Sequence, residues 1–93
     1  MIDSDDSDDL TAGIAQRLLI TRTVIGISQL EFGKGAGLSQ PQYHQYESGK
    51  RRLTLDAALS LCSAYNLTLD WLYRGDLSGL PHRLVQQIET LRR

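Results

Sequence analysis

Amide and imidazole groups, which both donate and accept hydrogen bonds, are concentrated in one short segment at Gln40, Gln42, His44 and Gln45. A glutamine amide can make a bidentate pair with N6 and N7 of adenine, and no carboxylate or lysine interrupts this set. Hydroxyl and cationic side chains suited to phosphate follow at Ser48, Lys50, Arg51 and Arg52. The two groups together indicate a nucleic-acid surface. A solvated polar face is the alternative, and on charge alone it is the simpler interpretation.

The formal net charge of −1 hides an uneven distribution of charge along the 93 residues. Residues 1–9 hold five Asp and no base, whereas residues 10–93 hold ten basic and six acidic residues, a net charge of +4. The excess falls within residues 17–52, and a basic half suggests phosphate binding. The acidic segment is predicted to be a disordered tail whose simplest role is solubility. The alternative is an arm that mimics phosphates and competes for the basic half.

Size and composition exclude several classes of protein. A chain of 93 residues forms one domain at most, and 41% hydrophobic with 23% charged residues is typical of a globular protein. The sequence has no run of about 18 apolar residues, so no membrane span is predicted. The acidic start is unlike a secretory signal, so a cytoplasmic location is expected. The lone thiol Cys62, and His44 and His82 without ligand spacing, predict neither a disulfide nor a metal site. No nucleophile–base set suggests an enzyme, and no cofactor is expected.

Two short helices with matching N-terminal signals are predicted in the middle of the chain. Ser28 with Glu31, and Ser39 with Gln42, each form a capping box, in which the hydroxyl accepts the third backbone N–H and the later side chain reaches back. Gly37 ends the first of these helices by permitting a positive φ. A link of about three or four residues that contains a glycine is typical of a helix-turn-helix, which projects its second helix into the major groove of DNA.

The rest of the chain is also predicted to be helical, because no stretch alternates strictly between apolar and polar residues. Apolar spacing and terminal signals place further helices before Gly26, between Thr54 and Asn66, over about 69–74, and after Pro81. The predicted organisation is an acidic disordered tail over 1–9, a helix-turn-helix domain over 10–76, and a linker and C-terminal helix over 77–93.

The stretch from Ile14 to Gly75 resembles the phage-repressor-like (Xre-type) helix-turn-helix family. The resemblance is carried, in order and spacing, by Arg17-Leu18 with Arg22, Gly26-Ile27-Ser28-Gln29, Gly37-Leu38-Ser39, Tyr46-Glu47-Ser48-Gly49-Lys50-Arg51 and Asn66-Leu67-Thr68-Leu69-Asp70-Trp71-Leu72. It implies an all-α fold of five helices around one core, here with an added C-terminal helix. It also implies binding of double-stranded operator DNA, usually as a homodimer.

The resemblance assigns roles to particular residues. Gln29 is expected to bond a DNA phosphate and to brace Gln40, and Arg22 is expected to pair with Glu47 and fix the angle of the recognition helix. The expected DNA-binding residues are Gln29, Gln40, Gln42, His44, Gln45, Ser48, Lys50, Arg51, Arg52 and Arg17. Gln40 and Gln45 are the main candidates for base contacts. The others are candidates for phosphate contacts, except that Gln42 is partly occupied by its role in the capping box. Tyr43 and Tyr46 are interpreted as core.

Three features depart from the family pattern or remain open. Gly33 and Gly35 stand where better helix formers are usual, at a cost of about 1 kcal/mol each relative to Ala, so the second helix is predicted to be soft until packed. Pro41 occupies a position that often carries a base-reading side chain. Leu19, Ile20 and Val24 form a second apolar strip on the first helix. The C-terminal helix is expected to cover that strip, either in its own subunit or, with a slight preference, in a partner subunit.

The sequence therefore predicts a sequence-specific DNA-binding transcriptional regulator, with repression the expected direction, no catalysis and no membrane. An antitoxin of a toxin–antitoxin pair that uses the same fold is an alternative. A helical module that binds a partner peptide rather than DNA is a further alternative, which the glutamine-rich face and the basic turn disfavour.

Overall fold

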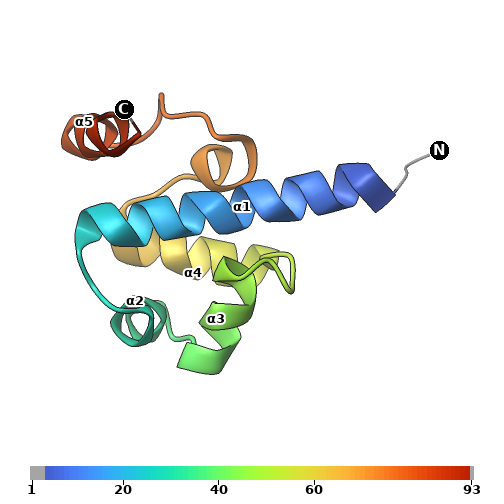
Figure 1. The fold of residues 1–93 in the computed structure, drawn as a ribbon. Coiled ribbons are helices and arrows are strands. Elements are labelled where there is room, and N and C mark those ends of the chain that lie inside the picture. The colour runs from blue at the N-terminus through green and yellow to red at the C-terminus, as the bar shows by residue number, and fades with distance from the viewer. Residues whose placement is uncertain (1–3, 93) are drawn as a thin grey trace.

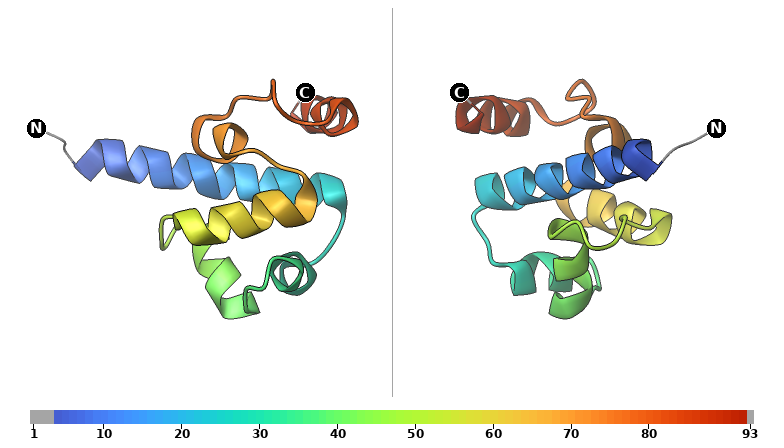
Figure 2. Two further views of the ribbon diagram at one scale, coloured as in Figure 1. Left: turned by 180° about the vertical axis from the view of Figure 1, so that it is seen from behind. Right: turned by 45° about the vertical axis from the view of Figure 1, so that its right-hand side comes forward.

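The structure is all-helical over the residues it describes, 4–92 of this computed structural model (Figure 1). The elements in order are α1 (Ser4–Ile25), α2 (Gln29–Gly35), α3 (Gln40–Glu47), α4 (Leu55–Tyr65), the π-helical turn η1 (Asp70–Arg74) and α5 (His82–Leu91). The long α1 runs through the middle, with α2, α3 and α4 below it and η1 and α5 above it (Figures 1 and 2). The predicted fold class, a helix-turn-helix domain with an added C-terminal helix, is confirmed.

Helix α1 begins earlier than the sequence predicts. Residues 1–9 were expected to form a disordered tail, but α1 starts at Ser4 and is continuous to Ile25. Residues 1–3 of that predicted tail lie outside the described residues. The physical reason is that a helix, once its packed turns have nucleated it, extends with the gain of one backbone hydrogen bond for each residue added, which composition alone does not show.

The predicted side-chain caps are confirmed at Ser28, Ser39 and Thr54, the N-caps of α2, α3 and α4. Each hydroxyl accepts a hydrogen bond from the backbone N–H three residues later, at 3.1 to 3.2 Å. Glu31 differs from the expected box, because its carboxylate accepts from the Ser28 hydroxyl at 3.3 Å. These caps fix the start of both helices of the helix-turn-helix, since they satisfy backbone N–H groups that a first turn leaves unpaired.

The unusual glycines of α2 permit two close approaches. A Cβ on Gly33 would lie 3.0 Å from the Cβ of Tyr43, so the buried Gly33 lets α2 and α3 pack tightly. A Cβ on Gly35 would collide with the hydroxyl of Tyr65, which donates to the carbonyl of Phe32 at 2.7 Å. The tertiary contacts therefore account for the poor helix formers that propensity alone treats as defects.

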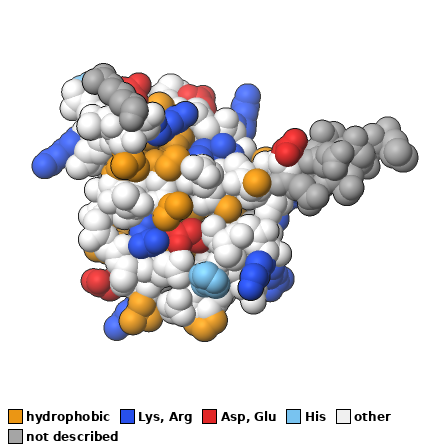
Figure 3. All heavy atoms as spheres, in the orientation of Figure 1, with side chains coloured by type: hydrophobic (Ala, Val, Ile, Leu, Met, Phe, Trp, Pro, Cys, Tyr) orange, Lys and Arg blue, Asp and Glu red, His pale blue; other side chains and the backbone are white. Residues whose placement is uncertain are grey.

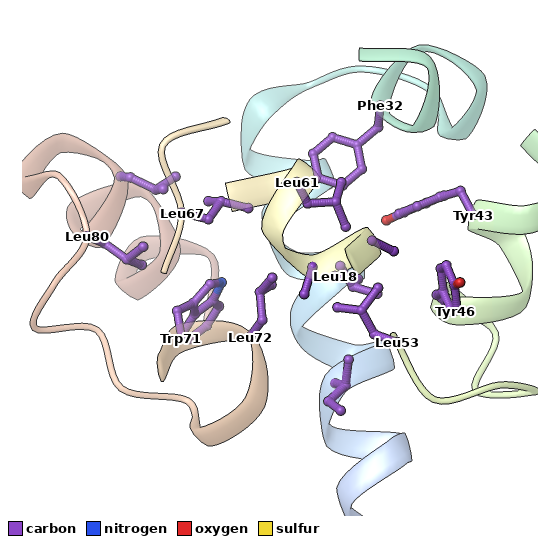
Figure 4. Close-up of a cluster of buried hydrophobic side chains, with 14 of the residues drawn as sticks. Leu18, Phe32, Tyr43, Tyr46, Leu53, Leu61, Leu67, Trp71, Leu72 and Leu80 are labelled. Carbon is purple, nitrogen blue, oxygen red and sulfur yellow. The ribbon is translucent and has the colours of Figure 1, made fainter. Parts of the chain in front are cut away.

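The core lies between α1 and the helices on both sides of it, and Figure 4 shows Leu18, Leu61 and Leu72 at its centre. Trp71 is fully buried, and its indole N–H donates to the hydroxyl of Thr21 at 2.9 Å. That hydroxyl donates in turn to a backbone carbonyl of α1 at 2.7 Å. The indole N–H thus lies inside the core.

Helix α5 packs against α1 of its own chain (Figure 2). Ile88 is fully buried and Leu84 nearly so, and both belong to the same core cluster, against which Ile20 and Val24 pack. Of the strip on α1, only Leu19 stays exposed, at 42% of its surface. The intramolecular alternative for the C-terminal helix is therefore the observed one, because its own subunit already supplies the apolar surface that α5 needs.

Among residues 4–92, no single helix is both long and apolar enough to cross a bilayer, and only the bent pair of 9–25 with α2, at 98°, reaches that length and composition.

Candidate nucleic-acid interface

Helix α3 presents one polar face to solvent and one aromatic face to the core. Tyr43 and Tyr46 are buried, as predicted, whereas Gln42 and His44 are exposed. Gln40 and Gln45 are half-buried at the edge of the exposed face. This face lies in the lower part of the view in Figure 3, where few acidic side chains reach the surface. The four polar side chains of this set, of which Gln40 and Gln45 were expected to read bases, therefore come from one helix and flank one surface.

The carboxylate of Glu47 is the centre of a hydrogen-bond network behind that face. Arg22 donates to its two oxygens, from Nε at 2.7 Å and from an Nη at 3.2 Å, so the residues that the resemblance pairs are in bidentate contact. The hydroxyl of Tyr43 donates to the same carboxylate at 3.1 Å, and the amide nitrogen of Gln29 also donates to it. Only 6% of the Glu47 side chain and 20% of the Arg22 side chain are exposed. The network ties α1, α2 and α3 together.

The electrostatics of the network keep Glu47 ionised. Burial by itself would raise the pKa of the Glu47 carboxyl, but the hydrogen bonds from Arg22 and Gln29 and the charge of Arg22 outweigh it, so this pKa lies below its ordinary value. The hydrogen bond to Glu47 raises the pKa of Arg22, and burial beside the carboxylate raises the pKa of Tyr43. The tyrosine hydroxyl therefore stays a donor and the ion pair stays charged at neutral pH.

Gln29 connects this network to the exposed face of α3. Because its amide nitrogen donates to Glu47, its oxygen must point the other way, where it accepts from the amide nitrogen of Gln40 at 3.0 Å. The same oxygen contacts Nδ1 of His44 at 3.2 Å. An amide oxygen only accepts, so Nδ1 of His44 carries a hydrogen. Gln40 keeps a second N–H and its oxygen for another partner, and its position is fixed through Gln29 by the buried ion pair.

The basic turn, residues 48–52, follows α3 directly. The backbone N–H groups of Lys50 and Arg51 both donate to the carbonyl of Gln45, at 3.0 and 3.1 Å, so the turn is tied to the end of the helix. The side chains of Lys50 and Arg51 are exposed. Arg52 is also exposed, and its Nε donates to the hydroxyl of Thr11 on α1 at 3.2 Å. Figure 3 shows cationic side chains gathered over this region, beside the face of α3.

The structure does not bring Arg17, which was expected to bind phosphate, to this surface. Its Nε donates to the carbonyl of Leu72 at 2.9 Å, on the side of α1 that faces η1. Burial, and secondarily the charge of Arg92, lowers the pKa of Arg17. Helices α2 and α3 lie on the opposite side of α1 (Figures 1 and 2). Sequence alone could not distinguish these two sides, because a cation beside an apolar stripe suits either one.

Two contributors to the site were missed from the sequence. The hydroxyl of Tyr43 belongs to the Glu47 network although the residue was interpreted only as core, and the four-residue spacing of the two was the available signal. Thr11 anchors Arg52, and no local pattern indicates that contact, because 41 residues separate the two in the chain.

A family model described as helix-turn-helix matches residues 22–72, which include α2, α3 and α4 and more than half of the chain. No curated protein and no solved structure matches.

Proposed function

Because the chain belongs to the phage-repressor-like helix-turn-helix family, we propose that it is a sequence-specific regulator of transcription, acting as a repressor, that binds double-stranded DNA through α3. The observation that carries the proposal is the braced position of Gln40. Its amide is held by Gln29, which is held in turn by the buried Glu47. A preorganised amide on an exposed helix, flanked by a basic turn, matches what base reading beside a phosphate backbone requires.

In this docking, α3 lies in the major groove, and residues on either side of α3 bind the sugar-phosphate backbone of the DNA. Gln40 and Gln45 read base edges. Lys50, Arg51, Arg52 and Ser48 bind phosphates on one side, and Gln29 uses its second amide hydrogen on the other. His44 already uses Nδ1–H toward Gln29, so only its doubly protonated ring donates from Nε2 to a phosphate. Gln42 stands exposed beside this surface.

Salt-dependent DNA binding tests the proposal. Binding to a random duplex is expected at low salt, and log K is expected to fall with log salt by about 0.9 for each phosphate neutralised. Lys50→Ala should make the slope of log K against log salt shallower by about 0.9, the value of one phosphate contact. It should weaken binding to all duplexes alike, because the contact reads no base. Arg83→Ala, an exposed cation on α5, serves as the control and should change neither quantity. An absence of duplex binding at low salt would favour the interaction-module alternative instead.

Dimerisation is the second part of the proposal. One α3 reads only a few base pairs, so two subunits on a two-fold axis should bind half-sites about 10 base pairs apart. Deleting α5 is a poor test, because Ile88 belongs to the core of its own subunit. Sedimentation of the full chain, alone and on a palindromic duplex, is the better measurement. We expect twice the 10.4 kDa chain mass on the palindrome, and one chain per duplex would contradict the dimer.

A further inference from the structure

The guanidinium of Arg17 is held in one direction on the side of α1 that faces η1. Its Nε donates to the carbonyl of Leu72 at 2.9 Å, and this bond leaves its two terminal nitrogens for other partners. No acidic side chain that the structure describes among residues 9–92 forms an ion pair with Arg17. A half-buried cation in the middle of α1 is therefore fixed in position, while its charge lacks a described carboxylate to balance it.

Two glycines make room for this guanidinium. A Cβ on Gly13, one turn earlier in α1, would lie 3.2 Å from both terminal nitrogens of Arg17, and a Cβ on Gly75 would lie 3.4 Å from one of them. Gly75 is also suited to its φ of +77°, at the end of η1. Gly13 has no positive φ to account for it, and a glycine inside a helix is destabilising relative to alanine. The space that Gly13 leaves for Arg17 gives a physical reason for its presence.

A second cation lies near the first. Arg92 is exposed at the end of α5, and its charge is the second cause, after burial, of the lowered pKa of Arg17. The two guanidinium groups are thus close enough to repel each other. Two like charges in a partly buried place raise the electrostatic energy of the free protein, and an anion between them would relieve that repulsion.

Both arginines line one hollow of about 590 Å³ between α1, η1 and the end of α5. Its walls also include the apolar side chains of Leu19, Ile20 and Leu91, and Leu19 and Leu91 are 42% and 45% exposed. A concave site with apolar walls and a few fixed polar groups is typical of small-molecule binding. The hollow lies on the side of α1 away from α2 and α3, so an occupant would leave the proposed DNA surface uncovered (Figures 1 and 2).

We propose that this hollow binds a small organic anion, with a carboxylate or phosphate group between Arg17 and Arg92 and an apolar portion against Leu19 and Leu91. The terminal nitrogens of Arg17 stand side by side, which suits two oxygens of such a group. Arg92 supplies the second charge. The apolar walls favour an aliphatic portion, because binding removes it from water. This site lies apart from the DNA surface, and the proposal goes beyond the proposed function without depending on it.

Hexanoate is the probe that tests the site, because it combines a carboxylate with a short apolar chain. The full chain is titrated at constant ionic strength, and binding is followed by the fluorescence of Trp71, the single tryptophan, which lines the hollow. We expect saturable binding and NMR shifts of the backbone amides of Gly13 and Gly75. Hexanamide, which lacks the charge, should bind about tenfold more weakly, the size of a hydrogen bond to a charged group. Hexyl phosphate, titrated in parallel, shows which of the two head groups the site prefers.

Two arginine variants and a matched control assign the charge. Arg92→Gln should weaken hexanoate binding by about two- to fivefold, the range of an exposed ion pair, because its side chain is exposed. Arg17→Gln should weaken it by about tenfold or more, since its paired donors are lost. Arg83→Gln removes an exposed arginine of α5 that does not line the hollow, and it should bind hexanoate as the wild type does.

Three results would overturn the proposal. They are no saturable binding of hexanoate or hexyl phosphate, equal affinity for hexanoate and hexanamide, and equal hexanoate affinity in Arg92→Gln and Arg83→Gln. Arg17→Gln also loses the bond to Leu72, so its affinity is compared only when its circular dichroism matches that of the wild type. If it does not fold, Arg92→Gln decides the outcome.

Discussion

Replacing Glu47 with alanine is expected to lower the free energy of unfolding by about 3 kcal/mol, the lower end of the cost of breaking a buried ion pair. The variant removes the carboxylate from an Arg22 side chain that is only 20% exposed, and it also removes the acceptor of Tyr43 and Gln29. Arg22 keeps a fifth of its surface in solvent, which is why the lower end applies. Chemical denaturation of the wild-type and variant chains measures the difference.

A matched pair elsewhere in the chain provides the control. Arg74 and Asp70 are 3.8 Å apart with side chains 78% and 61% exposed, so Asp70→Ala should cost no more than about 0.5 kcal/mol.

The stabilisation of the fold by Glu47 should also be lost in acid. The pKa of Glu47 is lowered in the folded state, so its stabilisation is present above the unfolded glutamate pKa and is lost as pH falls through the folded value. Glu47→Gln should flatten that part of the dependence of the free energy of unfolding on pH. Equal losses from Glu47→Ala and Asp70→Ala would refute the buried network.

Replacing Gln45 with alanine is expected to cost about 1–3 kcal/mol on the preferred site and to relax base preference there, with little change on a random duplex. The substitution leaves the contacts of Gln45 to the basic turn in place, because they come from its backbone carbonyl. Gln40→Ala should give a loss of the same size, with a further effect from releasing Gln29. The preferred site comes from selection on a library of random duplexes.

The comparison that isolates base reading uses a glutamine far from α3. Gln86 is exposed on α5, so Gln86→Ala should bind both the selected and the random duplexes as the wild type does. If Gln40→Ala and Gln45→Ala both keep the wild-type preference, α3 is not the reading element. A loss that is equal on the selected and random duplexes would instead assign these residues to the backbone.

The sequence by itself determined the order of the helices and the caps at which α2, α3 and α4 begin, but not where α1 begins. The hydroxyls of Ser28, Ser39 and Thr54 cap the predicted helices, and Asn66 adopts the left-handed conformation at the end of α4. The order of the motifs was enough to identify the helix-turn-helix, whose family model matches 22–72. These features are local, because a cap or a terminator acts within three or four residues of itself, and a single sequence states such interactions directly.

Only the tertiary structure decided which side of α1 each residue serves. It turned Arg17 toward η1, placed the Trp71 indole N–H on Thr21, and packed α5 on its own chain. It also showed that Gly33 admits Tyr43. The reason is physical: these contacts join residues far apart in the chain, and a helix with apolar and charged groups on several faces offers each face to more than one partner. Only the packing of all the helices together selects among those partners.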